Sequence, residues 1–545
     1  MNNIGFLCGS LSQYKFLDYS GIFEKNEPLI LTYSPTVGTS SPFSSSTTYT
    51  NCIVDWGDGE IVEYGRELAT HTFESEDDVT IRVVFEGLTS LSIMNNSKET
   101  LDRSRLKKID GVLNGCENLT DLNYLCYDAS NLTYLSKDLF KNCINVESAC
   151  GMFIDTFLSE YPDLPPNLKD GTGMFDGCTN LTKIQAITCP LENMNYMFKS
   201  SGLIEPPNIP TTVKYLDYTF ENTKIETMPY MENSIVETMD YTFSNCINLT
   251  YTTKIPNTVT SMENTFTGCI NLKAFTNFSN NLEDMTNTFI GCTSLVVVPE
   301  IPSSVKYLNG TFSGCSSLKE MPKLNEGITS MIESFKKCIS IVETKEIPST
   351  VKTFVGTFYG CDNLERIANF PQNTTNMEMA YENCSLLYKL PDELPETVIN
   401  LSRCFMFCTH IVIAPKITGN PEDLSFMFAS CERLEYLSNE SLPESVTNIS
   451  SMCQNCYTLQ EVPYVLHSGL TNISYAFVNC HSATNAFITI LCNITDEEML
   501  YNCFGGYGMY NDPSEITTLQ YVDEFGYQTA LLLSEQSEHV EIGTA

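Results

Sequence analysis

Residues 259–272 read VTSMENTFTGCINL, and the pattern of this stretch recurs along most of the chain. Its mark is a tetrad, Phe-x-x-Cys, with an apolar residue three positions further on. The tetrads end at Cys116, Cys143, Cys178, Ser201, Thr223, Cys246, Cys269, Cys292, Cys315, Cys338, Cys361, Cys384, Cys408, Cys431, Cys456, Cys480 and Cys503. Every step from Cys246 to Cys384 is 23 residues. A fixed period of this length predicts stacked repeats, each burying its apolar stripe against its neighbours.

The length of the period decides which kind of repeat is expected. The spacing of Met262, Phe266 and Cys269 would also fit one face of a helix, so an array of helical repeats is the structural alternative. Helix-pair repeats need about 33–47 residues, whereas leucine-rich repeats use about 20–29. We therefore expect a mainly β fold with short helical turns, a right-handed solenoid of leucine-rich-repeat-type coils. Each coil should hold a short strand near Leu-x-x-(Ile/Val/Met) and at most one helical turn at the tetrad.

Within this solenoid the tetrads should form a core ladder. We expect inward side chains at Phe266, Cys269, Phe289, Cys292, Phe312, Cys315, Phe335, Cys338, Phe358 and Cys361. The long step between Cys143 and Cys178 predicts an extra loop at about residues 151–170. A second motif, Pro-x-(Ser/Thr)-Val, begins at Pro210, Pro256, Pro302, Pro348, Pro395 and Pro443, which predicts that alternate coils use different turns.

The stretch at 259–272 resembles BspA-type leucine-rich repeats, whose pattern places an aromatic residue three positions before a Cys and a Leu three positions after it. The resemblance covers residues 105–503. It implies the repeat architecture and a setting among bacterial surface adhesins, protozoan surface proteins or phage-encoded proteins. A borrowed adhesive scaffold is thus an expectation by analogy of fold.

The chain has 23 cysteines, most of them in the repeat position. Because Ser201 and Thr223 occupy the same position, it requires a small residue and not a bond, and we expect buried free thiols. The Cys453-x-x-Cys456 pair has no second pair at zinc-finger spacing, so Cys453 is interpreted as a substitute for the tetrad Phe.

Residues 1–104 lack the repeat and read as strands separated by turns. VDWGDG at 54–59, HTF at 71–73 and VTIRVVF at 79–85 resemble a PKD-type immunoglobulin-like sandwich, which implies that Trp56 anchors a core. Asp55 and Asp58 suggest a catalytic or Ca²⁺ pair, but carboxylates that cap a turn are the simpler interpretation. This N-terminal β-sandwich is expected to attach or space the solenoid of residues 105–503. Residues 504–545 are expected to cap it, or to dock a partner through the apolar stretch at 529–533.

Composition narrows the function. The net charge of −37, from 67 acidic and 30 basic residues, disfavours binding to nucleic acid or anionic membranes. No long apolar run predicts membrane insertion, and the first residues do not resemble a secretory signal. None of the five His lies in a metalloprotease motif, and no phosphate-binding glycine loop is present. We expect no enzyme activity, no cofactor and no metal site.

The variable positions should therefore bind a partner, and Tyr218, Asn222, Tyr241 and Tyr359 are the candidate binding surface. The first hypothesis is a phage virion component at the virion surface: a tail or head fibre, a decoration protein or a receptor-binding protein. Its partners would be a host surface protein or glycan, and other virion proteins. The alternatives are a bacterial or protist cell-surface adhesin and an intracellular scaffold. A homo-oligomer is left open.

Overall fold

The computed structural model describes residues 19–44, 46–93, 105–509, 511 and 514–543. It divides into two compact units, Met1–Asp170 and Gly171–Ala545. The first 18 residues, in which no secretory signal is expected, lie outside the described residues, as does segment 94–104 at the expected domain boundary. Extended backbone and turns dominate, as expected for a mainly β protein, and the α-helices of the described ranges are α1 (Ser20–Lys25) and α2 (Glu524–Ser534).

The first unit is built on a six-stranded sheet of order β4-β3-β6-β1-β7-β8 and a two-stranded sheet of β2 and β5. The strands are β1 (Leu29–Tyr33), β2 (Gly38–Ser40), β3 (Asn51–Asp55), β4 (Ile61–Tyr64), β5 (His71–Phe73), β6 (Val79–Glu86), β7 (Leu106–Gly111) and β8 (Tyr134–Leu135). Buried residues alternate with exposed or half-buried ones along β1 and β6, as expected for strands with one face toward a core.

Aromatic side chains join the two sheets of the first unit. Trp56 follows β3 and is fully buried, and its ring lies 5.0 Å from His71 and 6.0 Å from Phe73, both in β5. The chain turns sharply after Trp56 because Gly57 has a φ of +84°, and a Cβ there would lie 2.5 Å from the carbonyl oxygen of Thr80. The single Trp of the chain therefore lies in the core of this unit.

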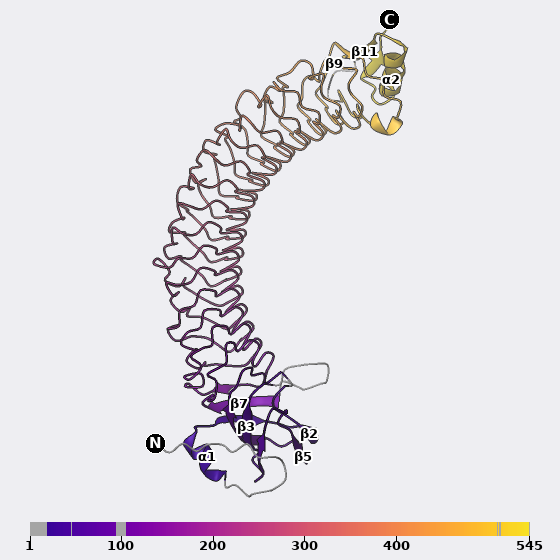
Figure 1. Ribbon diagram of the computed structural model, residues 1–545. Coiled ribbons are helices and arrows are strands. Elements are labelled where there is room, and N and C mark those ends of the chain that lie inside the picture. The colour runs from indigo at the N-terminus through magenta and orange to yellow at the C-terminus, as the bar shows by residue number, and fades with distance from the viewer. Residues whose placement is uncertain (1–18, 45, 94–104, 510, 512–513, 544–545) are drawn as a thin grey trace. The chain divides into compact units, whose positions relative to one another are not determined.

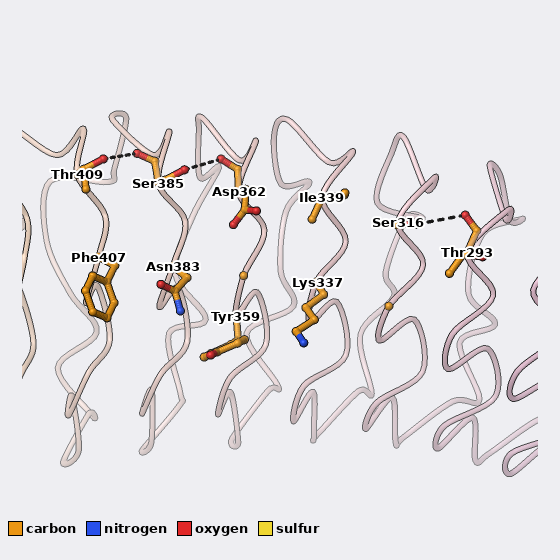
Figure 2. A pocket seen from close by; sticks show the side chains of 12 residues that line it. Thr293, Ser316, Lys337, Ile339, Tyr359, Asp362, Asn383, Ser385, Phe407 and Thr409 are labelled. Carbon is orange, nitrogen blue, oxygen red and sulfur yellow. Dashed lines mark hydrogen bonds between the residues drawn. The ribbon is translucent and has the colours of Figure 1, made fainter.

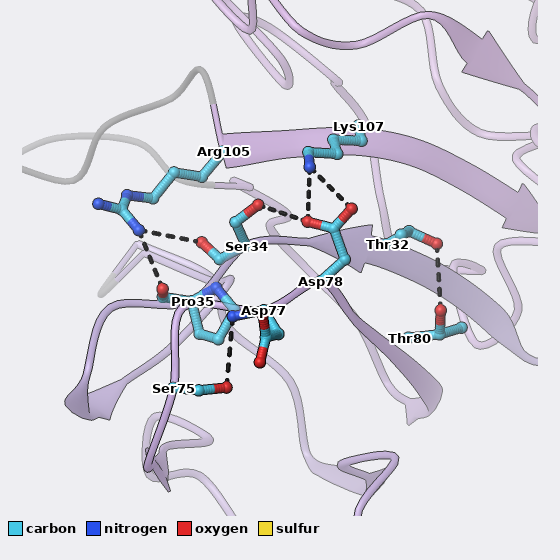
Figure 3. A network of polar contacts seen from close by, with 9 residues as sticks. All are labelled: Thr32, Ser34, Pro35, Ser75, Asp77, Asp78, Thr80, Arg105 and Lys107. Atoms are coloured by element: carbon cyan, nitrogen blue, oxygen red, sulfur yellow. Dashed lines mark hydrogen bonds and ion pairs between the residues drawn. The ribbon is translucent and has the colours of Figure 1, made fainter.

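Strand β7 belongs to the expected repeat region, yet it pairs antiparallel with β1 and parallel with β8. Side chains reinforce this junction (Figure 3): Asp78 accepts hydrogen bonds from Ser34 at 2.6 Å and from Lys107 at 2.5 Å, and Arg105 donates to the carbonyl of Pro35 at 2.9 Å. The Lys107 ammonium and the Ser34 hydroxyl lower the pKa of Asp78. The N-terminal sheet thus includes β7 and β8, two strands of the expected repeat region.

The first coils have a different register from the one that the tetrads predicted. The backbone N–H groups of Cys126 and Asp128 donate to the carbonyls of Met152 and Ile154, both at 2.8 Å. Phe220 and Asn222 make the corresponding bonds to Thr242 and Ser244 in the regular coils. Cys126 and Phe153 therefore occupy the tetrad's Phe position, and Cys116 and Cys143 lie in another turn, with their sulfur atoms 3.3 Å apart.

The expected loop at 151–170 is wrong for the same reason. Its tetrad runs from Phe153 to Thr156, and both of these end residues are buried. Asp170, at the end of the segment, forms a parallel bridge with Ser148 of the kind that joins later coils. The segment forms a coil of its own. The step from Cys143 to Cys178 looks long because the segment ending at Cys143 resembles a tetrad in sequence but does not hold the tetrad position in the structure.

In the second unit the coils follow one another in a stack (Figure 1). Two hydrogen-bond patterns alternate along each tetrad. The N–H groups of Tyr241, Phe243 and Asn245 donate to carbonyls of the following coil at 2.9, 2.9 and 2.6 Å. The N–H groups of Ser244 and Cys246 between them close turns within their own coil, both at 3.1 Å. This segment therefore uses its backbone donors without forming a helix or a long strand.

The described tetrads of the second unit contain no helix, which is within the expected limit of one helical turn per coil, because two residues per coil have left-handed backbone. They lie two positions before and two positions after the Phe position, as Tyr241 and Asn245 do with φ of 57° each. We call these the first and the second left-handed row. The expected short strands are reduced to single parallel bridges, such as Ser261 to Asp284.

The tetrad residues form the core of this stack. Each ladder Phe and Cys from Phe266 to Cys361 is fully buried, and successive Phe rings stack at 5.3 to 5.6 Å. The cysteine does more than occupy a small space in the core, because its thiol donates a hydrogen bond to the backbone carbonyl of the Phe in the preceding coil. Cys315 does so to Phe289 at 3.2 Å and Cys338 to Phe312 at 3.1 Å. None of the 22 cysteines of the described residues forms a disulfide.

The stack continues past Cys503. The N–H of Phe477 donates to the carbonyl of Cys503 at 2.9 Å, and the rings of Phe477 and Phe504 stack at 5.7 Å. Phe504 and Tyr507 therefore hold the tetrad positions, and the period extends beyond the expected end at residue 503. A parallel sheet of order β12-β11-β10-β9 follows, with helix α2 and the short 3₁₀ helix η2 (Glu497–Met499). Its strands are β9 (Val465–Leu466), β10 (Phe487–Ile490), β11 (Thr517–Tyr521) and β12 (Val540–Ile542).

Candidate binding face of the stacked coils

Two of the predicted binding residues, Tyr218 and Tyr241, lie in the first left-handed row beside Tyr196. Their rings are parallel, with centroids 4.6 Å apart between Tyr196 and Tyr218 and 4.5 Å apart between Tyr218 and Tyr241. Because the rings cover one another, their faces are closed to a ligand between them, and the row presents ring edges and hydroxyl groups.

The surroundings of this tyrosine row are charged. The ammonium of Lys199 lies 5.4 and 5.3 Å from the ring centroids of Tyr196 and Tyr218, and 2.9 Å from the carboxylate of Glu221. Partial burial and the neighbouring tyrosines raise the pKa of Tyr218 to about 12, so its hydroxyl stays protonated and neutral at physiological pH. Lys199 is thus held by a carboxylate and two rings.

Asn222 and Tyr359 have separate places. Asn222 is exposed in the second left-handed row with a φ of 57°, which asparagine tolerates better than most residues, so its backbone explains the residue type. Tyr359 lies several coils further on, with the ammonium of Lys336 5.4 Å from its ring centroid. The four predicted residues therefore do not form one site.

A groove of about 650 Å³ lies beside Tyr359 and crosses the coils between Thr293 and Thr409 (Figure 2). One line of residues follows the ladder cysteines directly: Thr293, Ser316, Ile339, Asp362, Ser385 and Thr409. The other comes from the second left-handed row directly before the cysteines: Gly314, Lys337, Gly360, Asn383 and Phe407. The groove is thus built from the two residues that flank each buried thiol.

The second left-handed row follows a rule that is broken only inside this groove. From Gly177 to Gly506 its residues in the second unit are Gly177, Ser200, Asn222, Asn245, Gly268, Gly291, Gly314, Lys337, Gly360, Asn383, Phe407, Ser430, Asn455, Asn479 and Gly506. All except Lys337 and Phe407 are glycine, asparagine or serine. A lysine at φ 58° and a phenylalanine at φ 62° are unusual, since left-handed backbone costs a side-chain-bearing residue about 1–2 kcal/mol.

Both exceptions present their side chains to solvent. Lys337 is exposed, and Phe407 retains 39% of its accessible surface. Large left-handed residues also occupy the first row, as at Arg403, Phe426 and Tyr475, so what sets Lys337 and Phe407 apart is their place in the second row and in the groove. Of the predicted binding residues, Tyr359 lines this groove; sequence reasoning missed Lys337 and Phe407, although the alignment of residues directly before the ladder cysteines carries the signal.

Polar groups along the groove are held in place by the coils. Ser385 donates to the carbonyl of Asp362 at 3.2 Å and Thr409 to that of Ser385 at 3.1 Å (Figure 2), and the Thr409 hydroxyl oxygen lies 3.3 Å from Nδ1 of His410. Asn383 and Lys337 add donors, and Asp362 adds an exposed carboxylate. The groove offers donors, acceptors and an aromatic ring, but no nucleophile paired with a base.

The buried thiols are chemically protected. Burial raises the pKa of the Cys361 thiol from near 9 to about 12, and that of Cys246 likewise to about 12. Since the thiolate is the reactive and metal-binding form, these ladder cysteines are inert near neutral pH. Cys453 and Cys456, the C-x-x-C pair, are also fully buried in the Phe and Cys positions of their coil.

In the described part of the first unit, Asp58, Glu60 and His71 form a group whose ligand atoms lie within 4.8 Å of one another. The two ring nitrogens of His71 lie 2.9 Å from the Asp58 carboxylate and 3.5 Å from that of Glu60. Asp58 also accepts the N–H of Glu60, and Asp55 accepts the N–H of Gly57 and pairs with Arg82. The backbone N–H of Glu60 and then His71 lower the pKa of Asp58. These contacts assign both aspartates to the turn.

Comparison with known proteins agrees with this architecture. The BspA type leucine rich repeat region matches the chain at residues 106–225, 152–273, 193–319, 236–357, 286–412, 333–437 and 424–521. The chain therefore belongs to the BspA-type leucine-rich repeat family. No curated protein matches it at a significant level.

Several solved structures are similar. A leucine-rich repeat protein from Bacteroides ovatus has 19% identity over 70% of this chain and 89% of its own, with a TM-score of 0.40. A leucine rich cell surface protein from Faecalibacterium prausnitzii has 18% identity over 54% of this chain and 85% of its own, with a TM-score of 0.34. Among the helices of the described residues, none is long and apolar enough to cross a membrane.

Proposed function

We propose that the chain is a non-enzymatic recognition protein of the cell-surface type, which binds its partner in the groove between Thr293 and Thr409. The observation that carries the proposal is the pair Lys337 and Phe407, the two exceptions to the glycine, asparagine and serine rule of the second left-handed row. Both line the groove, and both have strained backbone with an exposed side chain.

The cell-surface alternative now takes precedence over the virion component that we expected first. Family membership rests on most of the chain, and two of the three settings that the family resemblance implies are cell surfaces. In this proposal the stacked coils are a right-handed solenoid that presents the groove. The N-terminal unit, which we expect to be a PKD-like sandwich with Trp56 in its core, attaches or spaces it, and the sheet of β9 to β12 caps its end.

Substitutions in the groove test the proposed recognition role. Phe407→Asn removes the exposed ring and installs a residue that the same row uses at Asn383 and Asn455. Tyr475→Asn is the matched control, because Tyr475 is also a left-handed aromatic residue, with 37% of its surface exposed, but lies outside the groove. Lys337→Asn tests the charge in the same way.

The first assay measures binding of fluorescent full-length protein to intact bacterial cells and to their isolated envelopes. The second identifies, by mass spectrometry, peptides that a protease releases from the surface of cells that make the protein. We expect shaved peptides from the coils, saturable binding, loss of binding in Phe407→Asn and normal binding in Tyr475→Asn. Equal binding by all variants, or peptides found in purified virions and not on cells, would overturn the proposal.

A further inference from the structure

Building on the proposed function, we propose that the groove binds a linear polysaccharide of pyranose units that runs along the stack, with sugar hydroxyls on the polar residues and one sugar face on Phe407. The argument uses the spacing of the coils, the state of the backbone and the chemistry of the side chains that line the groove.

The spacing of the groove repeats with the coils. Successive ring centroids in the Phe position beneath it lie 5.6, 5.3, 5.4, 5.6 and 5.7 Å apart from Phe289 to Phe405. An extended peptide advances about 3.3–3.6 Å per residue, so its side chains would drift out of step with the coils. A pyranose unit in an extended chain spans close to one coil step, and each sugar could then meet the equivalent pair of groove residues.

Along the second left-handed row of the groove, the backbone donors that a peptide strand would need are already paired. The N–H groups of Lys337, Gly360, Asn383 and Phe407 donate to carbonyls of the following coil at 2.7 to 2.8 Å. Addition of a β-strand requires unpaired backbone groups, and these are already used between the coils. Recognition in this groove must therefore rest on side chains.

These side chains suit a polyol. A sugar hydroxyl both donates and accepts, and the groove supplies acceptors at Ser385, Thr409 and Asp362 beside donors at Asn383 and Lys337. The carbonyl bonds of Ser385 and Thr409 hold the hydroxyls in one orientation, which lowers the entropic cost of binding.

Phe407 adds an exposed aromatic ring to these polar groups. Phe407 is exposed, whereas the tyrosine row at Tyr196, Tyr218 and Tyr241 stacks on itself and leaves no face between its rings. The C–H face of a pyranose packs well on such an apolar ring. Gly314 and Gly360 carry no side chain at their row positions, which leaves room for the chain to pass.

The test measures binding of full-length protein to soluble β-linked polysaccharides and to their oligosaccharides of two to eight sugars, by affinity electrophoresis and calorimetry. The probes are β-1,4-linked glucan, mannan, xylan and N-acetylglucosamine oligomers, with a denatured, extended polypeptide for comparison. We expect affinity for at least one series to rise with length until the oligomer fills the groove. Phe407→Asn should weaken it about tenfold and Tyr475→Asn should leave it unchanged.

Thermal unfolding of each variant shows whether a loss reflects the site or the fold, and Lys337→Asn supplies a second variant in the same groove. Binding of the polypeptide with no binding of any saccharide would overturn the glycan assignment, as would affinity that is independent of length or unaffected by both groove variants. If both groove variants lose binding to cells while no saccharide binds, the recognition role stands and the glycan ligand falls. If they keep binding to cells, the proposed function falls as well.

Discussion

Raising the pH above 9 should destabilise this protein steeply, because its core contains a ladder of protonated thiols. Burial raises the pKa of Cys246 and Cys361 to about 12, and burial raises that of Cys338 and Cys384 well above 9. In the unfolded chain the same thiols titrate near pH 8.5. Between these pH values the unfolded state has lost protons that the folded state retains, so the free energy of unfolding falls as the pH rises.

The magnitude follows from the pKa values. Each buried thiol contributes stability that is fully present below about pH 8.5 and is lost at about 1.4 kcal/mol per pH unit up to its folded pKa. At pH 11, Cys246 and Cys361 should each contribute about 3 kcal/mol less than at pH 8. Since whole domains are stable by about 5–15 kcal/mol, two ladder thiols alone reduce stability by a large fraction.

Urea unfolding followed by circular dichroism at pH 8, 9, 10 and 11 measures the effect, with the ultraviolet absorbance of thiolate as a second readout. The control is the double variant Cys246→Ser and Cys361→Ser, whose hydroxyls can keep the bonds that the thiols make to Phe220 and Phe335 at 3.1 Å. Unfolding of the double variant should release about two fewer protons than unfolding of the parent at these pH values. Its free energy of unfolding should therefore fall less steeply as the pH rises. The reasoning is refuted if the folded protein titrates its thiols near pH 9, or if the variant and the parent lose stability in parallel.

Two further predictions concern the stack. Lys337→Asn should raise the free energy of unfolding by about 0.5–1 kcal/mol, because asparagine tolerates the φ of 58° and the exposed lysine loses little burial; a lower melting temperature would show that the backbone is not strained there. Phe312→Ala should lower it by about 3–5 kcal/mol, because the fully buried ring stacks on Phe289 at 5.6 Å and Phe335 at 5.3 Å; a loss below about 1 kcal/mol in chemical denaturation would contradict continuous stacking.

The repeat and its buried residues could be predicted from sequence because they depend on local pattern. Phe266 and Cys269 recur in phase with Val259 and Leu272, and only an inward stripe shared by stacked coils satisfies that pattern. The choice of Cys, Ser or Thr at one position also predicted a small buried residue. What the pattern did not show is that the thiol donates a hydrogen bond to the preceding coil.

The register of the irregular coils was decided by the tertiary structure. The segments ending at Cys143 and Cys503 look like tetrads, yet Phe153 and Phe504 hold the Phe positions in those coils. A residue's slot is set by which carbonyls of the next coil receive its N–H, and that pairing is made between distant segments. Residue type alone therefore cannot assign it where the spacing departs from 23 residues.

The sequence by itself determined that the chain is a stack of small repeats with an aromatic and thiol core, since periodic burial leaves a periodic trace. Only the tertiary structure decided where ligand binding is best supported. Tyr218 and Tyr241 were predicted to bind because they are aromatic residues at variable positions of the repeat, but stacking closes their ring faces. Lys337 and Phe407 look ordinary in the sequence, and the structure distinguishes them by placing two large side chains in a left-handed row whose other positions in the second unit are glycine, asparagine or serine.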